Sequence, residues 1–345
     1  MLERIRAEIA AAGGWISFAR YMELALHAPG LGYYARGARQ FGAEGDFVTA
    51  PELGSLFGRT LARQLNELDG PILELGAGSG ALAETLLKEL QREYFVLETS
   101  AALRARQAAR LGDRVKFLDR LPERFRGVII ANEVVDAIPA HAVAWRAGGI
   151  MERGVTGDLT WAERPARGEL LDHARALDVP VPYESEINLA ASGWLRSLAA
   201  SLEQGAIFIV DYGFPRAEYY HPQRSMGTLM CHTRHRAHGD PFLHPGEQDI
   251  TAHVDFSALA AAARESGLEV LGYATQAQFL VNCGITEVLS EANAENALHY
   301  APIAAEAQRL LSPAEMGELF KVLAVGRGVN RSLLGFSRGE RSHTL

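Results

Sequence analysis

The chain has 345 residues, of which 48% are hydrophobic and 22% charged, and its formal net charge is −8 at pH 7. These values are typical of a globular protein longer than one ordinary domain, so we expect a core with a large insertion or two lobes. The negative charge argues against nucleic acid or an anionic membrane as partner. Two cysteines cannot form a disulfide framework, and no apolar run is long enough to span a membrane. The N-terminus lacks the apolar run of a secretory signal, so we expect a cytoplasmic protein.

The first 68 residues are expected to be mainly helical. Apolar positions at Ile5 and Ile9 predict an amphipathic helix over 2–12, and Ser17 is a suitable N-cap for a second helix over 18–26. A third helix is expected at about 53–68. The stretch before it, 41–52, is rich in glycine, aromatic and acidic residues, which is typical of an ordered loop that serves a site. A turn-rich connecting loop is the alternative.

Residues 71–80 have the sequence Pro-Ile-Leu-Glu-Leu-Gly-Ala-Gly-Ser-Gly, in which a short apolar run precedes three alternate glycines. A helical pattern follows, so this stretch predicts a strand, a glycine turn and a helix. Such a turn brings bare backbone amides close to a ligand at a helix N-terminus. The next strand, 94–97, ends in Glu98, an acid that is well placed to accept hydrogen bonds from ribose hydroxyls.

The glycine pattern alone leaves the ligand open. Gly76, Gly78 and Ala81 also satisfy the dinucleotide fingerprint, so a nicotinamide or flavin nucleotide is one alternative, and a glycine turn without a ligand is another. Glu74 favours S-adenosylmethionine (SAM), because E-x-G-x-G-x-G is the signature of SAM-dependent methyltransferases. The predicted cofactor residues in this part of the chain are Glu74, Gly76, Ala77, Gly78, Gly80, Glu98 and Thr99.

Strand and helix patterns alternate over 71–75, 81–90, 94–98, 101–110, 115–118 and 127–131. This rhythm predicts an α/β fold with a doubly wound, Rossmann-like sheet of the class I methyltransferase kind. Asp119 follows the third strand at the sheet edge that binds ligands, where it would lie near adenine; a turn residue is the alternative. Asn132, Glu133 and Asp136 follow the fourth strand, and Asp211 follows an apolar run at 206–210. Buried polar residues at such strand ends need partners, so we expect substrate chemistry there, with helix capping as the alternative.

The remaining chain supplies additions to this core. Hairpin strands are expected at 141–145 and 151–161, a helix near 185–203, and a final strand pair at 268–274 and 320–325. The histidines of 214–255 fit no zinc spacing, so no metal is expected. We divide the chain into a helical N-terminal segment with an active-site loop (1–68), a SAM-binding core (69–145, 204–275 and 318–330), an inserted substrate-side lobe (146–203), a helical C-terminal lobe (276–317) and a disordered tail (331–345).

Six sequence blocks occur in order along the chain: G-Y-Y at 32–34, G-D-F-V-T-A-P-E at 45–52, E-L-G-A-G-S-G at 74–80, N-E-V-V-D-A-I-P at 132–139, D-Y-G at 211–213 and P-G-E-Q-D-I-T-A-H-V-D-F at 245–256. In these blocks the chain resembles the MidA family of SAM-dependent methyltransferases, whose mitochondrial members act as arginine methyltransferases in respiratory complex I assembly. The chain departs from the family pattern at Val134 and Val135, where aromatics are usual, and at Leu53-Gly54.

The resemblance implies SAM as cofactor and a protein arginine as methyl acceptor. Asp46, Thr49, Pro51 and Asn132 would then complete the cofactor site, with the loop 46–52 closing over the methionine end. Carboxylates are the natural partners of a guanidinium, and we expect Glu133 to be the main one, supported by Asp136, Asp211 and Glu52. The alternatives are a SAM-binding assembly factor with little turnover, an NAD-dependent oxidoreductase, and methylation of a small molecule. The sequence does not indicate an oligomeric state.

Overall fold

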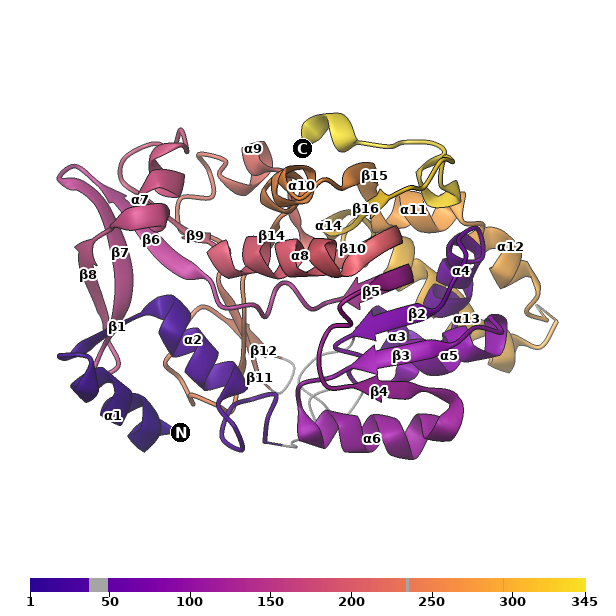
Figure 1. The fold of residues 1–345 in the computed structure, drawn as a ribbon, viewed down its shortest axis with the longest axis horizontal. Helices are drawn as coiled ribbons and strands as arrows, with labels where there is room; N and C mark the ends of the chain where they lie inside the picture. The colour runs from indigo at the N-terminus through magenta and orange to yellow at the C-terminus, as the bar shows by residue number, and fades with distance from the viewer. Residues whose placement is uncertain (37–48, 234–235, 294) are drawn as a thin grey trace.

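The computed structural model describes residues 1–36, 49–233, 236–293 and 295–345 of the chain. Its larger lobe is built on a sheet with the strand order β15-β16-β10-β5-β2-β3-β4, and β14 pairs with β10 (Figure 1). The strands β10, β5, β2, β3 and β4 run parallel to one another, whereas β16 is antiparallel to both β10 and β15. The bounds are β2 (Ile72–Leu75), β3 (Tyr94–Leu97), β4 (Lys116–Leu118), β5 (Phe125–Asn132), β10 (Leu202–Phe214), β14 (Val254–Asp255), β15 (Glu269–Thr275) and β16 (Phe320–Arg327).

This order confirms the predicted doubly wound sheet, including the antiparallel pair at its edge. The chain leaves β2 in one direction to form β3 and β4, and then returns to add β5 and β10 on the other side. The strand order therefore reverses between β2 and β5. Open α/β sheets bind their ligands beyond the carboxyl ends of the strands at such a reversal. The glycine turn after β2 and the acidic stretch after β5 meet there.

Both faces of the sheet are covered because its central strands are apolar at successive positions. Ile72, Val128 and Phe208 belong to one buried cluster, and Leu73, Ile129 and Ile207 belong to the cluster on the opposite face. Each fully buried side chain of this kind stabilises the fold by about 1.5–3 kcal/mol. The first face is covered by α4 (Leu56–Leu65), α5 (Ala81–Glu89), α11 (Gln276–Asn282), α12 (Ile285–Ser290) and α13 (Ala297–Leu311), and the second by α8 (Leu189–Ser201) and α10 (Phe256–Glu265). The remaining elements of this lobe are α3 (Ala50–Leu53), α6 (Ala101–Leu111), α14 (Met316–Leu319) and the 3-10 turn η1 (Gly112–Arg114).

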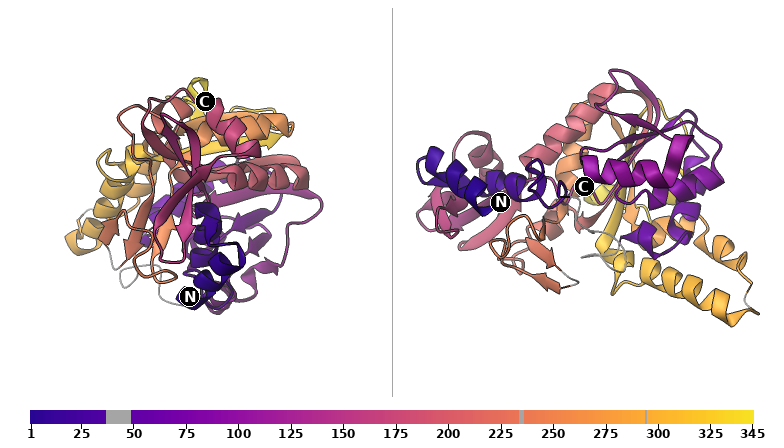
Figure 2. Two further views of the ribbon diagram at one scale, coloured as in Figure 1. Left: turned by 90° about the vertical axis from the view of Figure 1, so that its left-hand side faces the viewer. Right: turned by 90° about the horizontal axis from the view of Figure 1, so that it is seen from below.

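The smaller lobe contains an antiparallel sheet of order β1-β7-β6-β9, with β8 paired to β7. The N-terminal segment joins this lobe, because β1 pairs with β7 and the first helices pack beside it (Figure 2). Ser17 caps α2 as predicted, by accepting a hydrogen bond from the Arg20 amide at 3.2 Å. The bounds are α1 (Leu2–Ala11), β1 (Trp15–Ser17), α2 (Phe18–His27), β6 (His141–Arg146), β7 (Gly149–Thr156), β8 (Trp161–Pro165), α7 (Gly168–Arg175) and β9 (Tyr183–Ile187).

A third, small sheet of order β12-β11-β13 lies next to α2. It consists of β11 (Met230–Thr233), β12 (Arg236–His238) and β13 (Asp249–Thr251), and it follows α9 (Arg216–Tyr219) in the chain. The Tyr21 hydroxyl of α2 donates a hydrogen bond to the Pro241 carbonyl at 2.6 Å, which ties this region to the N-terminal segment. Within the described ranges, no helix has the length and apolar character needed to cross a membrane.

Three sequence-based expectations about elements are corrected. The helix expected at 53–68 is shorter, as α4, and the separate helix α3 precedes it in a stretch that was expected to be a loop. The helix expected from 185 begins only at Leu189, because residues 183–187 pair with β6 as a strand and Asn188 caps the helix. The tail predicted to be disordered is packed: Leu333 and Phe336 are buried, and short 3-10 turns form at η2 (Leu334–Phe336) and η3 (Ser342–Thr344). The short cluster Leu333-Leu334-Gly335-Phe336 stands in an otherwise mainly polar tail and gives no periodic signal, so the sequence could not reveal this packing.

Candidate active site

A cavity of about 480 Å³ lies at the carboxyl edge of the main sheet, where the smaller lobe and the third sheet meet it. Most of the predicted site residues line it together. These are Thr49, Pro51, Glu52, Glu74, Gly76, Ala77, Gly78, Glu98, Thr99, Asn132, Glu133 and Asp136. They come from α3, the turn after β2, the end of β3 and the end of β5. The residues predicted from strand ends, Glu74 to Asp136, therefore meet those that the family resemblance implied at 49–52.

The other predicted residues do not line the cavity. Gly80 is the N-cap residue of α5, behind the glycine turn. Asp119 is directed away, because its carboxylate is 86% exposed and pairs with Arg104 on α6. Asp211 is fully buried beneath the acidic stretch, where its Oδ2 accepts hydrogen bonds from the Val135 and Asp136 amides at 2.9 and 3.3 Å. Asp46 lies outside the described residues.

The glycine turn exposes bare backbone to the cavity. Gly76 and Gly78 have φ values of +60° and +54°, which side-chain-bearing residues rarely adopt. A Cβ atom on Gly76 would also lie 3.1 Å from a Val134 methyl carbon. Since α5 begins directly after this turn, its free amides favour a negatively charged ligand group such as a carboxylate.

Glu98 is held at the cavity wall by two donors. Its Oε1 accepts a hydrogen bond from the Ser100 amide at 2.8 Å, and its Oε2 accepts one from Gln107 Nε2 at 2.9 Å. The same Gln107 nitrogen donates to the Gly78 carbonyl at 2.9 Å, so one buried amide group links this acid to the glycine turn. Burial raises the pKa of Glu98. A carboxylate fixed in this way can accept hydrogen bonds from a ribose diol.

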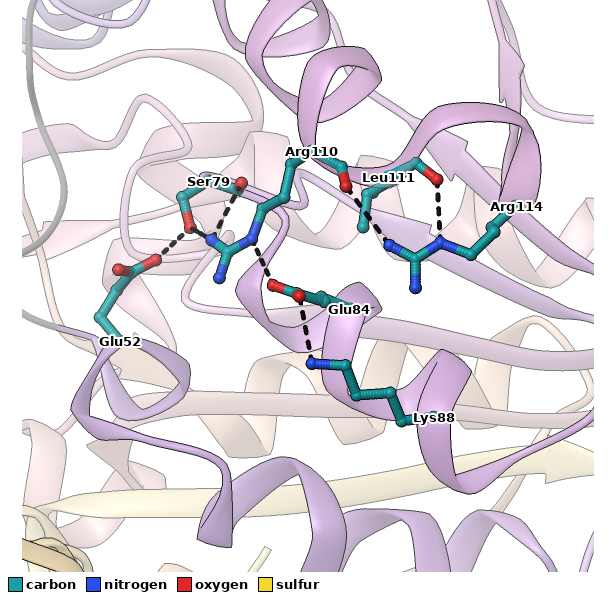
Figure 3. A network of polar contacts seen from close by, with 7 residues as sticks. All are labelled: Glu52, Ser79, Glu84, Lys88, Arg110, Leu111 and Arg114. Atoms are coloured by element: carbon teal, nitrogen blue, oxygen red, sulfur yellow. Dashed lines mark hydrogen bonds and ion pairs between the residues drawn. The ribbon is translucent and has the colours of Figure 1, made fainter.

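Segment α3 is joined to the glycine turn through a charged network (Figure 3). The Ser79 hydroxyl donates a hydrogen bond to Glu52 Oε1. Arg110 Nη1 donates to that same hydroxyl oxygen at 3.0 Å, and Arg110 Nε donates to Glu84 Oε2 at 2.7 Å. Glu52, predicted as a support for the acceptor, therefore contacts the cofactor-side turn.

Glu74 forms part of the buried floor of the cavity. It is 2% exposed, and its Oε2 accepts a hydrogen bond from the Tyr94 hydroxyl at 2.7 Å. Burial raises its pKa to about 7, which the Tyr94 bond only partly offsets. This environment explains how a charged residue type can occupy the middle of a parallel strand.

Glu133 has a backbone conformation that is unusual for a residue with a side chain. Its φ is +52°, which costs roughly 1–2 kcal/mol and reverses the chain immediately after β5. Its amide continues the sheet by donating to the Val210 carbonyl at 2.8 Å. Its Oε1 accepts hydrogen bonds from Asn132 Nδ2 at 3.2 Å and from the Ala50 amide at 3.4 Å. Burial and the neighbouring Asp136 raise the pKa of Glu133 to about 8.

Two tyrosine–aspartate pairs stand beside Glu133. The Tyr212 hydroxyl donates to Asp136 Oδ2 at 2.6 Å, and the Tyr34 hydroxyl donates to Asp249 Oδ1 at 2.9 Å. Burial raises the pKa of Asp136 to about 6, although the Tyr212 bond opposes this. Burial, with Asp136 and Glu133 nearby, also raises the pKa of Asp211. Four acids, Glu133, Asp136, Asp211 and Asp249, therefore lie in one largely buried part of the site.

Several lining residues were not predicted from the sequence, among them His27, Tyr34, Tyr212, Asp249 and His253. The last four lie in the sequence blocks that carried the family resemblance. The resemblance therefore pointed to these blocks, but we predicted no role for these four residues. His27 had no signal: it ends an ordinary amphipathic helix and stacks on Tyr34 with ring centroids 5.7 Å apart. His253 stacks on Phe214, and burial together with Arg224 lowers its pKa to about 4, so its ring is neutral at pH 7.

These features fit SAM as the ligand. Glu98 suits the ribose, and the glycine turn suits the amino-acid end. Asn132 Oδ1 is buried at the cavity without a hydrogen-bond partner among the described residues, which leaves an acceptor for a ligand donor. In the same ranges, no group of three His, Cys, Asp or Glu side chains could hold a metal ion.

Comparison with known proteins decides the family. The model of a family described as "Putative S-adenosyl-L-methionine-dependent methyltransferase" matches residues 56–274, more than half of the chain. The chain belongs to this family. It is 50% identical, with a TM-score of 0.96, to the crystal structure of a COG1565 superfamily member from Burkholderia thailandensis bound to S-adenosyl-homocysteine, covering 100% of this chain and 96% of that one. A native structure from the same organism is 49% identical, with a TM-score of 0.94 and the same coverage.

The curated relatives are more distant but match along most of their length. A "Protein arginine methyltransferase NDUFAF7 homolog, mitochondrial" from Drosophila melanogaster is 28% identical over 95% of this chain and 85% of its own. The corresponding protein from Danio rerio is 28% identical over 94% of this chain and 86% of its own. The predicted family, fold and cofactor are thus confirmed: the protein is a SAM-dependent methyltransferase, and a nicotinamide cofactor is not supported.

Replacing Glu98 should weaken cofactor binding specifically. In Glu98→Ala the ribose would lose a charged hydrogen-bond acceptor, so we expect the affinity for S-adenosyl-homocysteine to fall about 10- to 50-fold. Isothermal titration calorimetry measures this change. Asp119→Ala is the matched comparison, because its exposed carboxylate does not reach the cavity. If Asp119→Ala lowered the affinity for S-adenosyl-homocysteine as much as Glu98→Ala, Asp119 would have to contact the cofactor, and its observed position outside the cavity would be contradicted.

Proposed function

We propose that this methyltransferase transfers the methyl group of SAM to a guanidinium nitrogen of a protein arginine. The observation that carries the proposal is the charge of the cavity. Six carboxylates line it, and no Lys or Arg does so among the described residues; the acids are Glu52, Glu74, Glu98, Glu133, Asp136 and Asp249. A cavity of this charge favours a cationic acceptor.

The acids fall into two electrostatic groups. On the cofactor side, Glu98 raises the pKa of Glu74, and in a second group Asp136 and Asp249 raise the pKa of Glu133. Burial also raises the pKa values of Glu133 and Asp136, so it favours the protonated forms of these two acids. A bound cation would reverse this, because an opposite charge at hydrogen-bond distance stabilises the ionised carboxylate. The second group is therefore the better candidate for the acceptor site.

A guanidinium suits this group in shape as well as in charge. It is planar, presents five N–H donors and can bind carboxylates in a bidentate manner. Because its pKa is above about 12, it must be polarised before a nitrogen can act as a nucleophile. Glu133 is our choice for this role, since it lines the cavity and its carboxylate is held by Asn132 and the Ala50 amide. Asp136 would support it through Tyr212, and Asp249 through Tyr34.

Little covalent chemistry is required of the protein. When bound, SAM supplies a methyl group that is already activated by its attachment to a sulfonium. The chain's residues then have to align the acceptor nitrogen and take the proton that this nitrogen loses. With the guanidinium bound, the Glu133 carboxylate is stabilised in its ionised form and can accept this proton. The similarity to relatives that are named protein arginine methyltransferases also supports this acceptor.

The proposal is tested with labelled SAM and a lysate from a strain that lacks the gene. We expect labelled protein bands whose tryptic peptides carry methylarginine, found by mass spectrometry. Label on lysine or only on small molecules would overturn the arginine assignment. Binding of S-adenosyl-homocysteine without transfer to any component would instead favour an assembly factor with little turnover.

A further inference from the structure

The N-terminus of α4 is capped by a residue from a distant helix. Glu306, on α13, lies 250 positions from Leu56, and its Oε1 accepts a hydrogen bond from the Leu56 amide at 2.7 Å and from the Phe57 amide at 3.4 Å. Ser55, the N-cap residue of α4, makes no side-chain capping bond. The free amides at a helix N-terminus need an acceptor, and a carboxylate suits them in charge as well. Glu306 therefore takes the place of a local cap.

The contact requires a glycine at position 54. A Cβ atom there would lie 2.0 Å from Glu306 Oε2, closer than any real contact. The φ of Gly54 is 167°, an extended value that any residue adopts. The glycine is thus needed for space and not for its backbone conformation. Glu306 itself is only 6% exposed, and a methyl group at position 54 would have to push its carboxylate away from the α4 amides.

The contact lies next to the segment that forms one wall of the cofactor cavity. Helix α3 ends at Leu53, directly before Gly54, and its residues Pro51 and Glu52 line the cavity. At its start, the Ala50 amide donates to Glu133 Oε1, and in its middle Glu52 accepts from Ser79. Glu306 contacts the chain directly after the other end of this short helix, where it bonds to the Leu56 and Phe57 amides.

We infer that Glu306 is a positioning residue for cofactor binding, which acts by holding α3 against the cavity. It does not line the cavity, so it works through the segment 50–57. A helix of four residues has little stability of its own and keeps its place only through such anchors. This role is independent of the acceptor, because it concerns the cofactor side of the site.

The test compares the affinity for S-adenosyl-homocysteine among three variants by calorimetry. In Glu306→Ala we expect the affinity to fall about fivefold to tenfold, the change that follows from losing one helix cap. In Glu306→Gln, which keeps an acceptor oxygen, the affinity should stay within about twofold. Asn296→Ala is the matched control: Asn296 caps α13 itself by accepting from the His299 amide at 3.2 Å. Its removal weakens the same helix without touching α4, so affinity should not change.

A merely structural role predicts a different result. Glu306→Ala and Asn296→Ala would then both lower the melting temperature, and both would leave the affinity within about twofold of the parent chain. That outcome would overturn the inference. In steady-state kinetics we expect Glu306→Ala to raise KM for SAM and to change kcat little.

Gly54→Ala gives an independent test that does not depend on the folding of Glu306→Ala. The added methyl group displaces the Glu306 carboxylate, so we expect a similar loss of affinity. In the double variant Gly54→Ala/Glu306→Ala the methyl group meets no carboxylate, so the two losses should not add. Additive losses would show that the two residues act separately, which would also overturn the inference.

Discussion

Glu133→Gln is expected to lower turnover about 100- to 1,000-fold while the affinity for S-adenosyl-homocysteine stays within about threefold. Glutamine keeps the shape of the side chain and an oxygen that can accept from the Ala50 amide. It has no charge with which to polarise a guanidinium, and it cannot take the proton that the acceptor loses. Positioned acid–base groups typically contribute factors of this size. The two readouts are single-turnover methyl transfer and calorimetric binding.

Glu123→Gln is a suitable control for this prediction. Glu123 is exposed and lies outside the cavity lining, so the same chemical change there should leave both readouts unchanged. If Glu133→Gln transfers methyl groups at the parental rate and still binds the cofactor product, the role given to Glu133 is wrong. Asp136→Asn would then be the next variant to measure, because Asp136 contacts Tyr212 in the same acidic group.

The residues of the site that directly follow strands were predictable, on the cofactor side and on the acceptor side alike. In a parallel sheet, successive carboxyl ends converge on one edge, so a residue directly after a strand can be placed from the chain pattern alone. Glu98 and Glu133 were located by this argument, and both line the cavity. Asp119 shows where the strand-end argument fails. It also follows a strand, but this strand is β4, the outermost one on that side of the sheet. There Asp119 pairs with Arg104 at the surface and does not face the cavity.

The other parts of the site, and the contacts that support it, depend on long-range pairs that no local pattern encodes. Tyr34 and Asp249 are 215 positions apart, and they meet because the N-terminal segment packs against the third sheet. Glu306 and Leu56 are 250 positions apart. Such pairs follow from the relative placement of the lobes, which periodicity does not determine. The buried tail residues Leu333 and Phe336 escaped prediction for the same reason: they fill a space whose walls are formed elsewhere in the chain.

The acidic group also illustrates a conflict between stability and activity. Carboxylates that are buried near one another, without a balancing cation, oppose folding, and natural proteins retain such an arrangement mainly where function needs it. Glu133 adds backbone strain to this electrostatic cost. Substitutions that stabilise proteins would remove both the buried carboxylate and the backbone strain at position 133. The presence of both at Glu133 therefore supports a role for this residue in the acceptor site.

The unliganded protein is therefore expected to lose stability as the pH rises from 6 to 9. Folding raises the pKa of Glu133 from 4.5 to about 8, that of Glu74 from 4.5 to about 7 and that of Asp136 from 3.8 to about 6. The folded state then binds more protons than the unfolded state across this interval. The stabilising contribution is complete below the unfolded pKa values and is lost as the pH rises through the folded ones. Glu133 alone would account for up to about 2 kcal/mol between pH 6 and pH 8.

Melting temperatures at pH 6, 7, 8 and 9 measure this loss. For a chain of this length, about 2 kcal/mol corresponds to a fall of roughly 3 °C. Glu133→Gln cannot ionise, so it should melt several degrees above the parent chain at pH 9 and with a smaller slope, while Glu123→Gln keeps the parental slope. Equal slopes for Glu133→Gln and the parent chain would contradict the raised pKa of Glu133.

A bound guanidinium should oppose this loss of stability at high pH, because it stabilises the ionised carboxylates. Methylguanidine should therefore raise the melting temperature more at pH 9 than at pH 6, and this difference should vanish in Glu133→Gln.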